Sequence, residues 1–397
     1  MSAETTQVGI VGAGPAGLTL AQLLKGRGIE SVVLESRSRE YCEHRIRAGV
    51  LEQGAVDLLR AIGAGERMDR EGIVHHGVSL QFDGERHRIP FSDLTGGATI
   101  MIYGQTEVVK DLIRLRLDAG DPLRFEAADV ALADIDGDRP RITYRQEGQV
   151  RELRCDLIAG CDGFHGVSRE SIPTGVLRVS ERDYLFGWLG ILADVAPSSE
   201  ELVYAHHERG FALLSLRSPT LSRLYVQVAH DEDVGEWPDE RIWAELQTRL
   251  GVSGWTLGEG PILEKGVTGM RSFVAAPMQY GRLYLAGDAA HIVPPTGAKG
   301  LNLAIADVEL LGEAIAAWYG SGDRSGLDGY TDACLRRVWR AEHFSWWMTS
   351  MLHRLPGDDP FDLELQLAQL RYVVSSPAAA TTLAENYVGI AGRRMGG

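Results

Sequence analysis

The segment Gly12-Ala13-Gly14-Pro15-Ala16-Gly17 has glycine at its first, third and sixth positions. It lies between a buried strand, expected at 7–11, and a helix, expected at about 15–25. The first glycine allows a tight turn, the second lets the backbone approach a pyrophosphate, and the third lets the helix pack closely on the strand. The helix N-terminus offers free N–H groups to the phosphates. This pattern predicts a dinucleotide site.

A second buried strand, expected at 31–34, completes a strand–helix–strand unit and implies parallel pairing. Glu35 ends this strand, where a carboxylate can accept hydrogen bonds from a ribose diol. The alternative interpretation is a glycine-rich turn without a ligand. The motif itself does not distinguish FAD from NAD(P).

Composition narrows the functional class. The 55 acidic and 40 basic residues give a net charge of −15, which argues against nonspecific nucleic-acid binding because that depends on neutralising phosphates. The four cysteines form no CxxC pair and indicate neither a disulfide framework nor a metal site. Without a secretory segment or an apolar run long enough to span a bilayer, we expect a cytoplasmic protein with no membrane partner.

Two later segments favour FAD. Residues 161–168 read CDGFHGVS, and residues 287–302 read GDAAHIVPPTGAKGLN. In the second, a strand ends at Asp288, which is placed to hydrogen-bond a polyol hydroxyl. A loop then leads into a helix near Gly300, whose N–H groups could face the electron-rich edge of a reduced isoalloxazine ring.

We therefore expect an α/β fold with α+β insertions, in which a Rossmann-like FAD-binding domain is interleaved with a β-sheet substrate domain. The 397 residues are enough for two or three domains. The expected ranges are 1–72, 101–178 and 266–320 for the FAD-binding domain, 73–100 and 179–265 for the substrate domain, and 321–397 for a helical C-terminal region.

A predicted hairpin carries polar side chains that suit an acidic ligand. Ser215 and Arg217 are two residues apart on one strand, and Arg223 and Tyr225 are two apart on the next, so each pair shares a face. Arginine pairs with a carboxylate bidentately, and hydroxyl groups satisfy the remaining lone pairs. Spacing alone is equally compatible with an exposed polar sheet face.

Further motifs extend over about residues 7–390. They are RIRAGVLEQG at 45–54, YGQTE at 103–107, FSWWM at 344–348 and AENYVG at 384–389. Together with the glycine, Asp-Gly and Gly-Asp motifs, they resemble the group A flavin-dependent aromatic hydroxylases. The resemblance implies a monooxygenase that converts 4-hydroxybenzoate to 3,4-dihydroxybenzoate with NAD(P)H and O2 through a flavin C4a-hydroperoxide. The alternatives are a related 4-substituted benzoate as substrate, a flavin dehydrogenase that inserts no oxygen, and a binding module without catalysis.

The resemblance also implies site residues. Ser215, Arg217 and Tyr225 would hold the substrate carboxylate. Tyr204 and Tyr387 would help to deprotonate the phenol, and His75, whose neighbour His76 is the nearest competitor, would connect them to solvent. The other implied catalytic residues are Pro295, through its carbonyl, Arg223, which would hold the flavin inward, Lys299, as positive potential, and Asn302.

Cofactor contacts follow in the same way. The implied FAD-binding residues are Gly12, Gly14, Gly17, Glu35, Arg47, Gln105, Asp162, Asp288, Gly300, Leu301 and Asn302. No second glycine motif is present, so NAD(P)H is expected at the surface, near Arg37, Tyr41, Arg45, Arg47, His165 and Arg271. Preference for NADPH or NADH stays open, with dual use favoured, and the segment 36–43 is alternatively a solvated charged loop. The C-terminal helices, with Trp346 and Trp347, form either a homodimer face or core.

Overall fold

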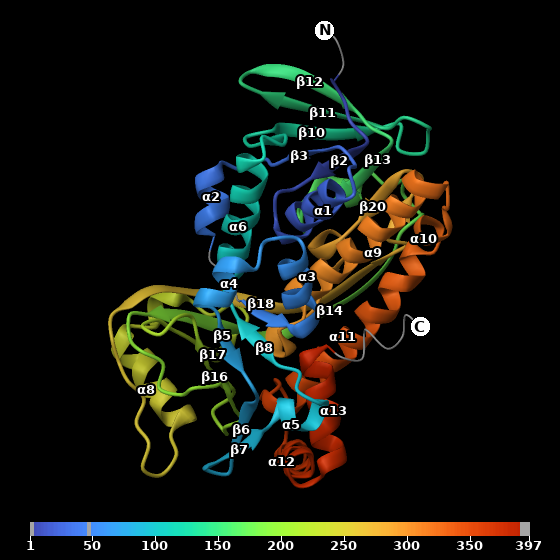
Figure 1. Ribbon diagram of the computed structural model, residues 1–397. Helices are drawn as coiled ribbons and strands as arrows, with labels where there is room; N and C mark the ends of the chain where they lie inside the picture. Colours follow the sequence, from blue (N-terminus) through green and yellow to red (C-terminus); the bar gives the residue numbers. More distant parts are fainter. Residues whose placement is uncertain (1–3, 46–48, 390–397) are drawn as a thin grey trace.

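Segments far apart in the sequence meet in one sheet of the computed structural model, which describes residues 4–45 and 49–389 (Figure 1). In this sheet β2 (Val8–Val11) pairs in parallel with β3 (Ser31–Leu34) and β13 (Leu157–Gly160), and β13 pairs with β20 (Leu283–Leu285). β2 is buried throughout, as expected for a strand covered on both faces. The edge strands are β9 (Leu123–Arg124) and β19 (Gln279–Tyr280).

Helix α1 (Pro15–Gly26) begins directly after the glycine-rich turn. Pro15 occupies the start of the helix, where its fixed φ is favourable and its missing N–H costs nothing. α1 packs against α6 (Gln105–Asp118) and α9 (Gly300–Ser321), and their apolar side chains share one core with the sheet. The predicted α/β fold is therefore confirmed.

The second large sheet lies at the opposite end of the molecule from the strands β10–β12 (Figure 1). Its order is β21-β18-β14-β17-β16-β15-β6-β7. The strands are β6 (Val78–Phe82), β7 (Glu85–Ile89), β14 (Arg178–Ala193), β15 (Val203–Ala205), β16 (Ala212–Leu216), β17 (Ser222–Ala229), β18 (Ile262–Ala276) and β21 (His291–Ile292). Helix α8 (Asp239–Leu250) packs on β15 and β16.

Two smaller sheets complete the β structure. The first has the strand order β1-β12-β11-β10, and the second has the order β4-β8-β5. Their strands are β1 (Glu4–Thr5), β10 (Ala128–Ala133), β11 (Arg141–Gln146), β12 (Gln149–Arg154), β4 (Val50–Glu52), β5 (Ile73–His75) and β8 (Ile100–Ile102).

The C-terminal region consists mainly of helices, and the last described helix ends at Val388. Ser376 accepts a hydrogen bond from the N–H of Ala379 and restarts the chain as α13. The remaining helices are α2 (Arg39–His44), α3 (Gln53–Ala61), α4 (Glu66–Glu71), α5 (Phe91–Thr95), α7 (Val167–Glu170), α10 (Ser325–Asp328), α11 (Tyr330–Leu352), α12 (Pro360–Ser375) and α13 (Pro377–Val388), with a 3-10 turn η1 (Val234–Glu236). In the described ranges no helix has the length and apolar character that crossing a bilayer requires. The domain boundaries stay a prediction.

Candidate functional site

The glycine-rich turn is shaped by close backbone contacts. Gly12 has a φ of 104°, and a Cβ there would lie 2.3 Å from the carbonyl oxygen of Cys161. A Cβ on Gly17 would lie 2.0 Å from the carbonyl oxygen of Gly12. Gly14 differs, because no atom lies within 4 Å of the place its Cβ would take. The N-terminus of α1 therefore faces open space at Gly14, where a pyrophosphate would fit.

The carboxylate of Glu35 is held by the same turn. Its two oxygens accept hydrogen bonds from the backbone N–H groups of Ala13, at 2.8 Å, and Arg37, at 2.8 Å. A carboxylate has about four lone-pair sites, so acceptor capacity remains for a ribose hydroxyl. Ribose binding by Glu35 stays a prediction, with which this free acceptor capacity is compatible.

Asp162 and Asp288, the acidic residues of the two later motifs, differ in burial and in their hydrogen bonds. Asp162 accepts hydrogen bonds from the N–H and the hydroxyl of Ser168, both at 2.9 Å, and braces the start of α7. Its other oxygen is buried without a partner among the described residues, and burial raises the pKa of the carboxyl. Asp288 lies exposed on the turn η2 (Gly287–Ala289), which the hydrogen bond from the Gly287 N–H to Asp307, at 3.0 Å, holds in place.

The start of α9 is more tightly bound to the protein than expected. Lys299 donates hydrogen bonds to Glu52, at 2.6 Å, and to the carbonyl oxygens of Asn386 and Tyr387, so its charge is paired. The Asn302 amide bonds the backbone of Val50, Glu52 and Ala298. The expected free positive potential of Lys299 is thus reduced by Glu52, whereas Gly300 faces open space.

Strand register gathers the predicted substrate residues on one face of the eight-stranded sheet. Tyr204 pairs with Leu213, which pairs with Tyr225, and Ser215 pairs with Arg223. Residues opposite each other in a ladder, and residues two apart on one strand, point to the same face. Tyr204, Ser215, Arg223 and Tyr225 therefore share that face.

The two arginines beside this face occupy gaps left by glycines. A Cβ on Gly190 would lie 3.0 Å from the Arg223 guanidinium and 3.2 Å from the Tyr225 ring. A Cβ on Gly104 would lie 2.4 Å from the Arg217 guanidinium. Arg217 follows the last residue of β16, and burial lowers its pKa despite the nearby charge of Glu107. Nη1 of Arg223 is buried with no partner among the described residues, which suits an anionic ligand.

The phenol end of the site contains two buried tyrosines. The hydroxyl groups of Tyr204 and Tyr387 hydrogen-bond to each other, and both side chains are 1% exposed. Burial raises the pKa of both phenols above the usual value near 10, so each keeps its proton at neutral pH. The pair can pass a proton along without carrying a lasting charge.

His75 and His76 are distinguished by burial. His75 is fully buried, and neither ring nitrogen has a partner among the described residues. His76 is exposed, and its Nδ1 lies 2.9 Å from the Ser92 hydroxyl. Burial lowers the pKa of His75 to about 4, so its imidazole is neutral near pH 7 in the protein as described. A neutral imidazole still donates and accepts at once.

Pro295 lies on the turn η3 (Pro295–Gly297), directly before α9. The next residue, Thr296, is fully buried, and its hydroxyl lies 2.8 Å from that of Thr349 on α11. This contact holds the turn η3 against α11, one of the C-terminal helices.

Comparison with known proteins identifies the family. The sequence profile of the FAD-binding domain family matches residues 5–345. The p-hydroxybenzoate hydroxylase of Acinetobacter baylyi is 48% identical over 391 residues, covering 98% of this chain and 96% of that protein. This chain belongs to the group A FAD-dependent aromatic hydroxylases. It is accordingly an FAD-dependent monooxygenase, with NAD(P)H as the co-substrate typical of the family.

More distant hydroxylases share its fold. A 3-(3-hydroxy-phenyl)propionate/3-hydroxycinnamic acid hydroxylase of Mycobacterium sp. (strain JLS) is 28% identical over 79% of this chain and 54% of that protein. The crystal structure of p-nitrophenol 4-monooxygenase from Pseudomonas putida superposes with a TM-score of 0.84 at 20% identity, over 97% of this chain and 99% of that one. At this low identity, the likeness to the p-nitrophenol 4-monooxygenase shows the fold alone.

The residues expected to bind NAD(P)H in this group A hydroxylase form two clusters. The Tyr41 ring lies 5.3 Å from the Arg37 guanidinium and 6.0 Å from that of Arg45. The Phe164 ring lies 5.0 Å from the His165 ring and 4.9 Å from the Arg271 guanidinium. Arg47 lies outside the described residues. Gln105 begins α6, and Leu301 is in the first turn of α9.

Sequence reasoning missed three residues that shape this hydroxylase site. Glu52 pairs with Lys299, Thr349 contacts Thr296, and Gly104 makes room for Arg217. Gly104 lies within the YGQTE motif and Glu52 within the RIRAGVLEQG motif, both of which carried the resemblance, so a signal was present for these two residues. The contacts of Glu52 and Thr349 join positions 247 and 53 residues apart, so local pattern does not indicate their partners.

Proposed function

We propose that the chain hydroxylates 4-hydroxybenzoate at carbon 3. The balanced reaction consumes 4-hydroxybenzoate, O2, NAD(P)H and a proton, and yields 3,4-dihydroxybenzoate, NAD(P)+ and water. The observation that carries the proposal is the common sheet face, which has a carboxylate-binding set at Ser215 and Tyr225 and a buried hydroxyl pair beginning at Tyr204. The 48% identical relative named p-hydroxybenzoate hydroxylase supports the same substrate.

The carboxylate end provides binding and orientation. Arg217 offers a planar pair of N–H donors that matches a carboxylate, and the hydroxyl groups of Ser215 and Tyr225 fill the remaining lone pairs. Ser215 is 8% exposed, and burial already disfavours the charged form of Arg217, so a bound carboxylate relieves that cost. An aromatic acid is therefore favoured over a neutral phenol.

The phenol end raises the nucleophilicity of the ring. Bound FAD would supply the chemistry that accepts hydride from NAD(P)H and activates oxygen for electrophilic attack on the substrate. Tyr204 accepts the substrate's phenolic proton as its own proton passes to Tyr387. Because the pKa of each tyrosine is raised, neither holds a negative charge, and the charge stays on the substrate ring. His75 relays the proton onward as a neutral imidazole.

The chain's own residues also hold the cofactor and exclude water. Gly12, Gly14 and Glu35 would bind the adenosine diphosphate half, and Asp288 the ribityl chain. Arg223 has an unpartnered buried N–H group that would face the flavin or an anionic ligand. Buried side chains such as Thr296 and Tyr387 keep water from the reacting centre, which limits loss of reducing equivalents as hydrogen peroxide.

For the co-substrate, we propose that the arginines at 37, 45 and 271 contact the phosphates of NADPH or NADH, with dual use favoured. Glu40 and Glu43 on α2 weaken the positive field that a 2′-phosphate requires. Arg39 is paired with Glu43 at 2.7 Å, which reduces it further.

We propose that the protein is a cytoplasmic homodimer whose C-terminal helices meet. Trp346, on α11, is 41% exposed, whereas Trp347 packs against the core beneath it. Trp339, which lies earlier on α11, is 49% exposed. Light scattering of the wild-type protein and of Trp346→Lys tests this arrangement, and a wild-type monomer would contradict it.

Oxidation of NADPH and NADH by the FAD-loaded protein tests the proposed reaction, with 3,4-dihydroxybenzoate and hydrogen peroxide quantified. We expect 4-hydroxybenzoate to stimulate oxidation and to yield product in matching amount. Stimulation without product would make 4-hydroxybenzoate an effector only, and would favour a related 4-substituted benzoate as the substrate.

A further inference from the structure

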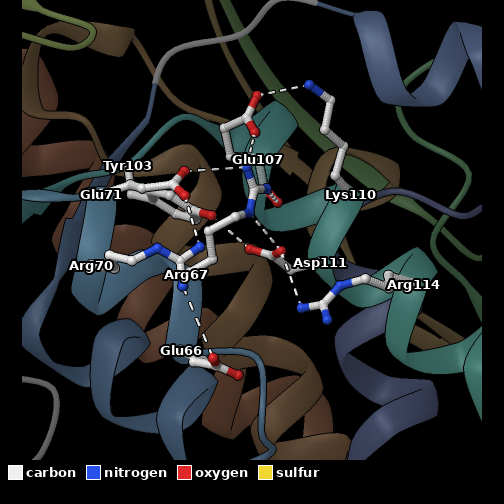
Figure 2. Close-up of polar contacts among 9 residues, drawn as sticks. All are labelled: Glu66, Arg67, Arg70, Glu71, Tyr103, Glu107, Lys110, Asp111 and Arg114. Atoms are coloured by element: carbon white, nitrogen blue, oxygen red, sulfur yellow. Dashed lines mark hydrogen bonds and ion pairs between the residues drawn. The ribbon is translucent and has the colours of Figure 1, made fainter.

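Arg67 on α4 is clamped by two carboxylates of α6 (Figure 2). Its Nε lies 2.9 Å from Oδ1 of Asp111, its Nη1 donates to the Glu107 carboxylate, and its Nη2 lies 2.9 Å from the Glu107 carbonyl oxygen. The side chain is 23% exposed and the Asp111 side chain 3%. A planar guanidinium bound through three nitrogens fixes the first turns of α6 against α4.

The Asp111 carboxylate also contacts Tyr103, which lies two residues before the start of α6. The Tyr103 hydroxyl donates to the second oxygen of Asp111 at 2.6 Å, and the Arg67 guanidinium lies 5.6 Å from the Tyr103 ring. The Tyr103 N–H donates to the carbonyl oxygen of Gly49 at 3.0 Å. Tyr103 is thus held at both its backbone and its hydroxyl, and buried networks of this kind are rigid because every member is satisfied.

Gly104, the next residue, lies directly against the substrate arginine. A Cβ on Gly104 would lie 2.4 Å from Cζ, Nη1 and Nη2 of Arg217 alike. All three atoms are equally close, so the guanidinium lies flat over the Gly104 backbone. The N–H groups of Glu107 and Val108 bond the Gly104 carbonyl oxygen at 2.8 and 3.1 Å, which fixes that backbone to α6.

We propose that Arg67, Tyr103, Glu107 and Asp111 form a positioning network that sets the Gly104 backbone as a platform for Arg217 and so determines affinity for the substrate carboxylate. The inference rests on the proposed function, in which Arg217 binds that carboxylate. These four are positioning residues, since they act through Gly104 and Arg217. The charge of Glu107 additionally favours the protonated form of Arg217.

Arg70, on the same helix as Arg67, makes no contact with α6 among the ion pairs of the described residues. Arg70 lies three residues from Arg67 on α4 but pairs only with Glu66, at 3.9 Å, and Glu71, at 2.9 Å, among the described residues in Figure 2. Its side chain is 61% exposed. Arg70 therefore offers a matched control, because its removal changes the charge of α4 equally and leaves α6 untouched.

Titration of the FAD-loaded protein with two ligands tests the network. The ligands are 4-hydroxybenzoate and the neutral 4-hydroxybenzaldehyde, with binding followed through the flavin absorbance. We expect Tyr103→Phe and Arg67→Ala to raise the dissociation constant of 4-hydroxybenzoate by roughly five- to tenfold, from loss of one charge-assisted hydrogen bond or more. We expect the dissociation constant of 4-hydroxybenzaldehyde to change less than about twofold in these variants. Arg70→Ala should change the dissociation constant of neither ligand. Arg67→Lys should recover part of the affinity.

The outcomes separate this inference from the proposed function. Equal weakening of both ligands, or loss of FAD, would reduce the network to general structural support and overturn the inference. Unchanged affinity in Tyr103→Phe and Gly104→Ala would also overturn it, even if Arg67→Ala failed to fold. A wild-type protein that binds no 4-hydroxybenzoate would instead contradict the proposed function, and this inference with it.

Discussion

The hydroxyl groups of Tyr204 and Tyr387 are hydrogen-bonded although 183 residues separate them. Tyr204 lies on β15 in the eight-stranded sheet and Tyr387 on α13 near the end of the described chain. The phenol end of the site therefore forms only when the C-terminal helices pack against that sheet. Because burial raises the pKa of both phenols, the pair suits the proposed proton relay, in which neither tyrosine holds a lasting charge.

Removing the first hydroxyl tests this relay. We expect Tyr204→Phe to retain FAD but to lose hydroxylation by roughly 10²-fold or more, because general acid–base assistance disappears. NAD(P)H should still be oxidised, with hydrogen peroxide as the product. Product and peroxide are measured together against wild type. Full product yield from the variant would remove the phenolate role from Tyr204.

The carboxylate anchor gives a prediction about binding. We expect Arg217→Ala to weaken the binding of 4-hydroxybenzoate by about 2 kcal/mol, or about 30-fold in the dissociation constant, because the ligand's charge would be buried without its partner. Ser215→Ala should cost less, about 1 kcal/mol, since one neutral hydrogen bond is lost. Arg209→Ala, which removes an exposed ion pair with Glu245, is the matched control. Equal affinity in Arg217→Ala and wild type would reassign the anchor.

Two glycines of the phosphate-binding turn should behave differently. Gly14→Ala places a methyl group in open space, so we expect normal unfolding behaviour and weaker FAD binding. Gly12→Ala places it 2.3 Å from the Cys161 carbonyl oxygen at a φ of 104°, so we expect loss of stability as well. Thermal unfolding with and without added FAD distinguishes the two variants. Undiminished FAD affinity in Gly14→Ala would mean that the pyrophosphate lies elsewhere.

Much of the nucleotide-binding half was predictable from local pattern, because a glycine turn, a buried strand and a helix are encoded within about 25 contiguous residues. Arg217 was singled out by its spacing with Ser215, whereas Tyr204 and Tyr387 were named through the resemblance alone. The platform under Arg217 was not predictable, since it joins α4, α6 and the end of β16 through Gly104. The low pKa of His75 was not predictable either. It results from burial by tertiary packing, which the sequence of the three-residue strand β5 does not indicate.

His353 predicts a pH dependence of stability. Its Nδ1 lies 3.0 Å from the Thr349 carbonyl oxygen, which can only accept, and its Nε2 lies 2.7 Å from the Trp188 Nε1–H, which can only donate. The ring is therefore neutral with its proton on Nδ1. Burial lowers its pKa to about 3, whereas the unfolded side chain titrates near 6.5.

The direction of this pH dependence of stability follows from where the folded and unfolded states take up a proton. Below pH 6.5 the unfolded state gains a proton that the folded ring takes up only near pH 3, so stability falls as the pH is lowered through this window. The contribution of His353 is at most about 1.4 kcal/mol per pH unit. Denaturant unfolding between pH 6 and 4.5 should give a shallower slope for His353→Asn than for wild type. Identical slopes would show that His353 is protonated in the folded protein.

The most direct test of the central claim is product formation under 18O2 with the FAD-loaded protein, NADPH or NADH, and 4-hydroxybenzoate. The account predicts 3,4-dihydroxybenzoate with one 18O atom, carried by the new hydroxyl at carbon 3. Coenzyme oxidation that yields only labelled hydrogen peroxide, or product without the label, would contradict it.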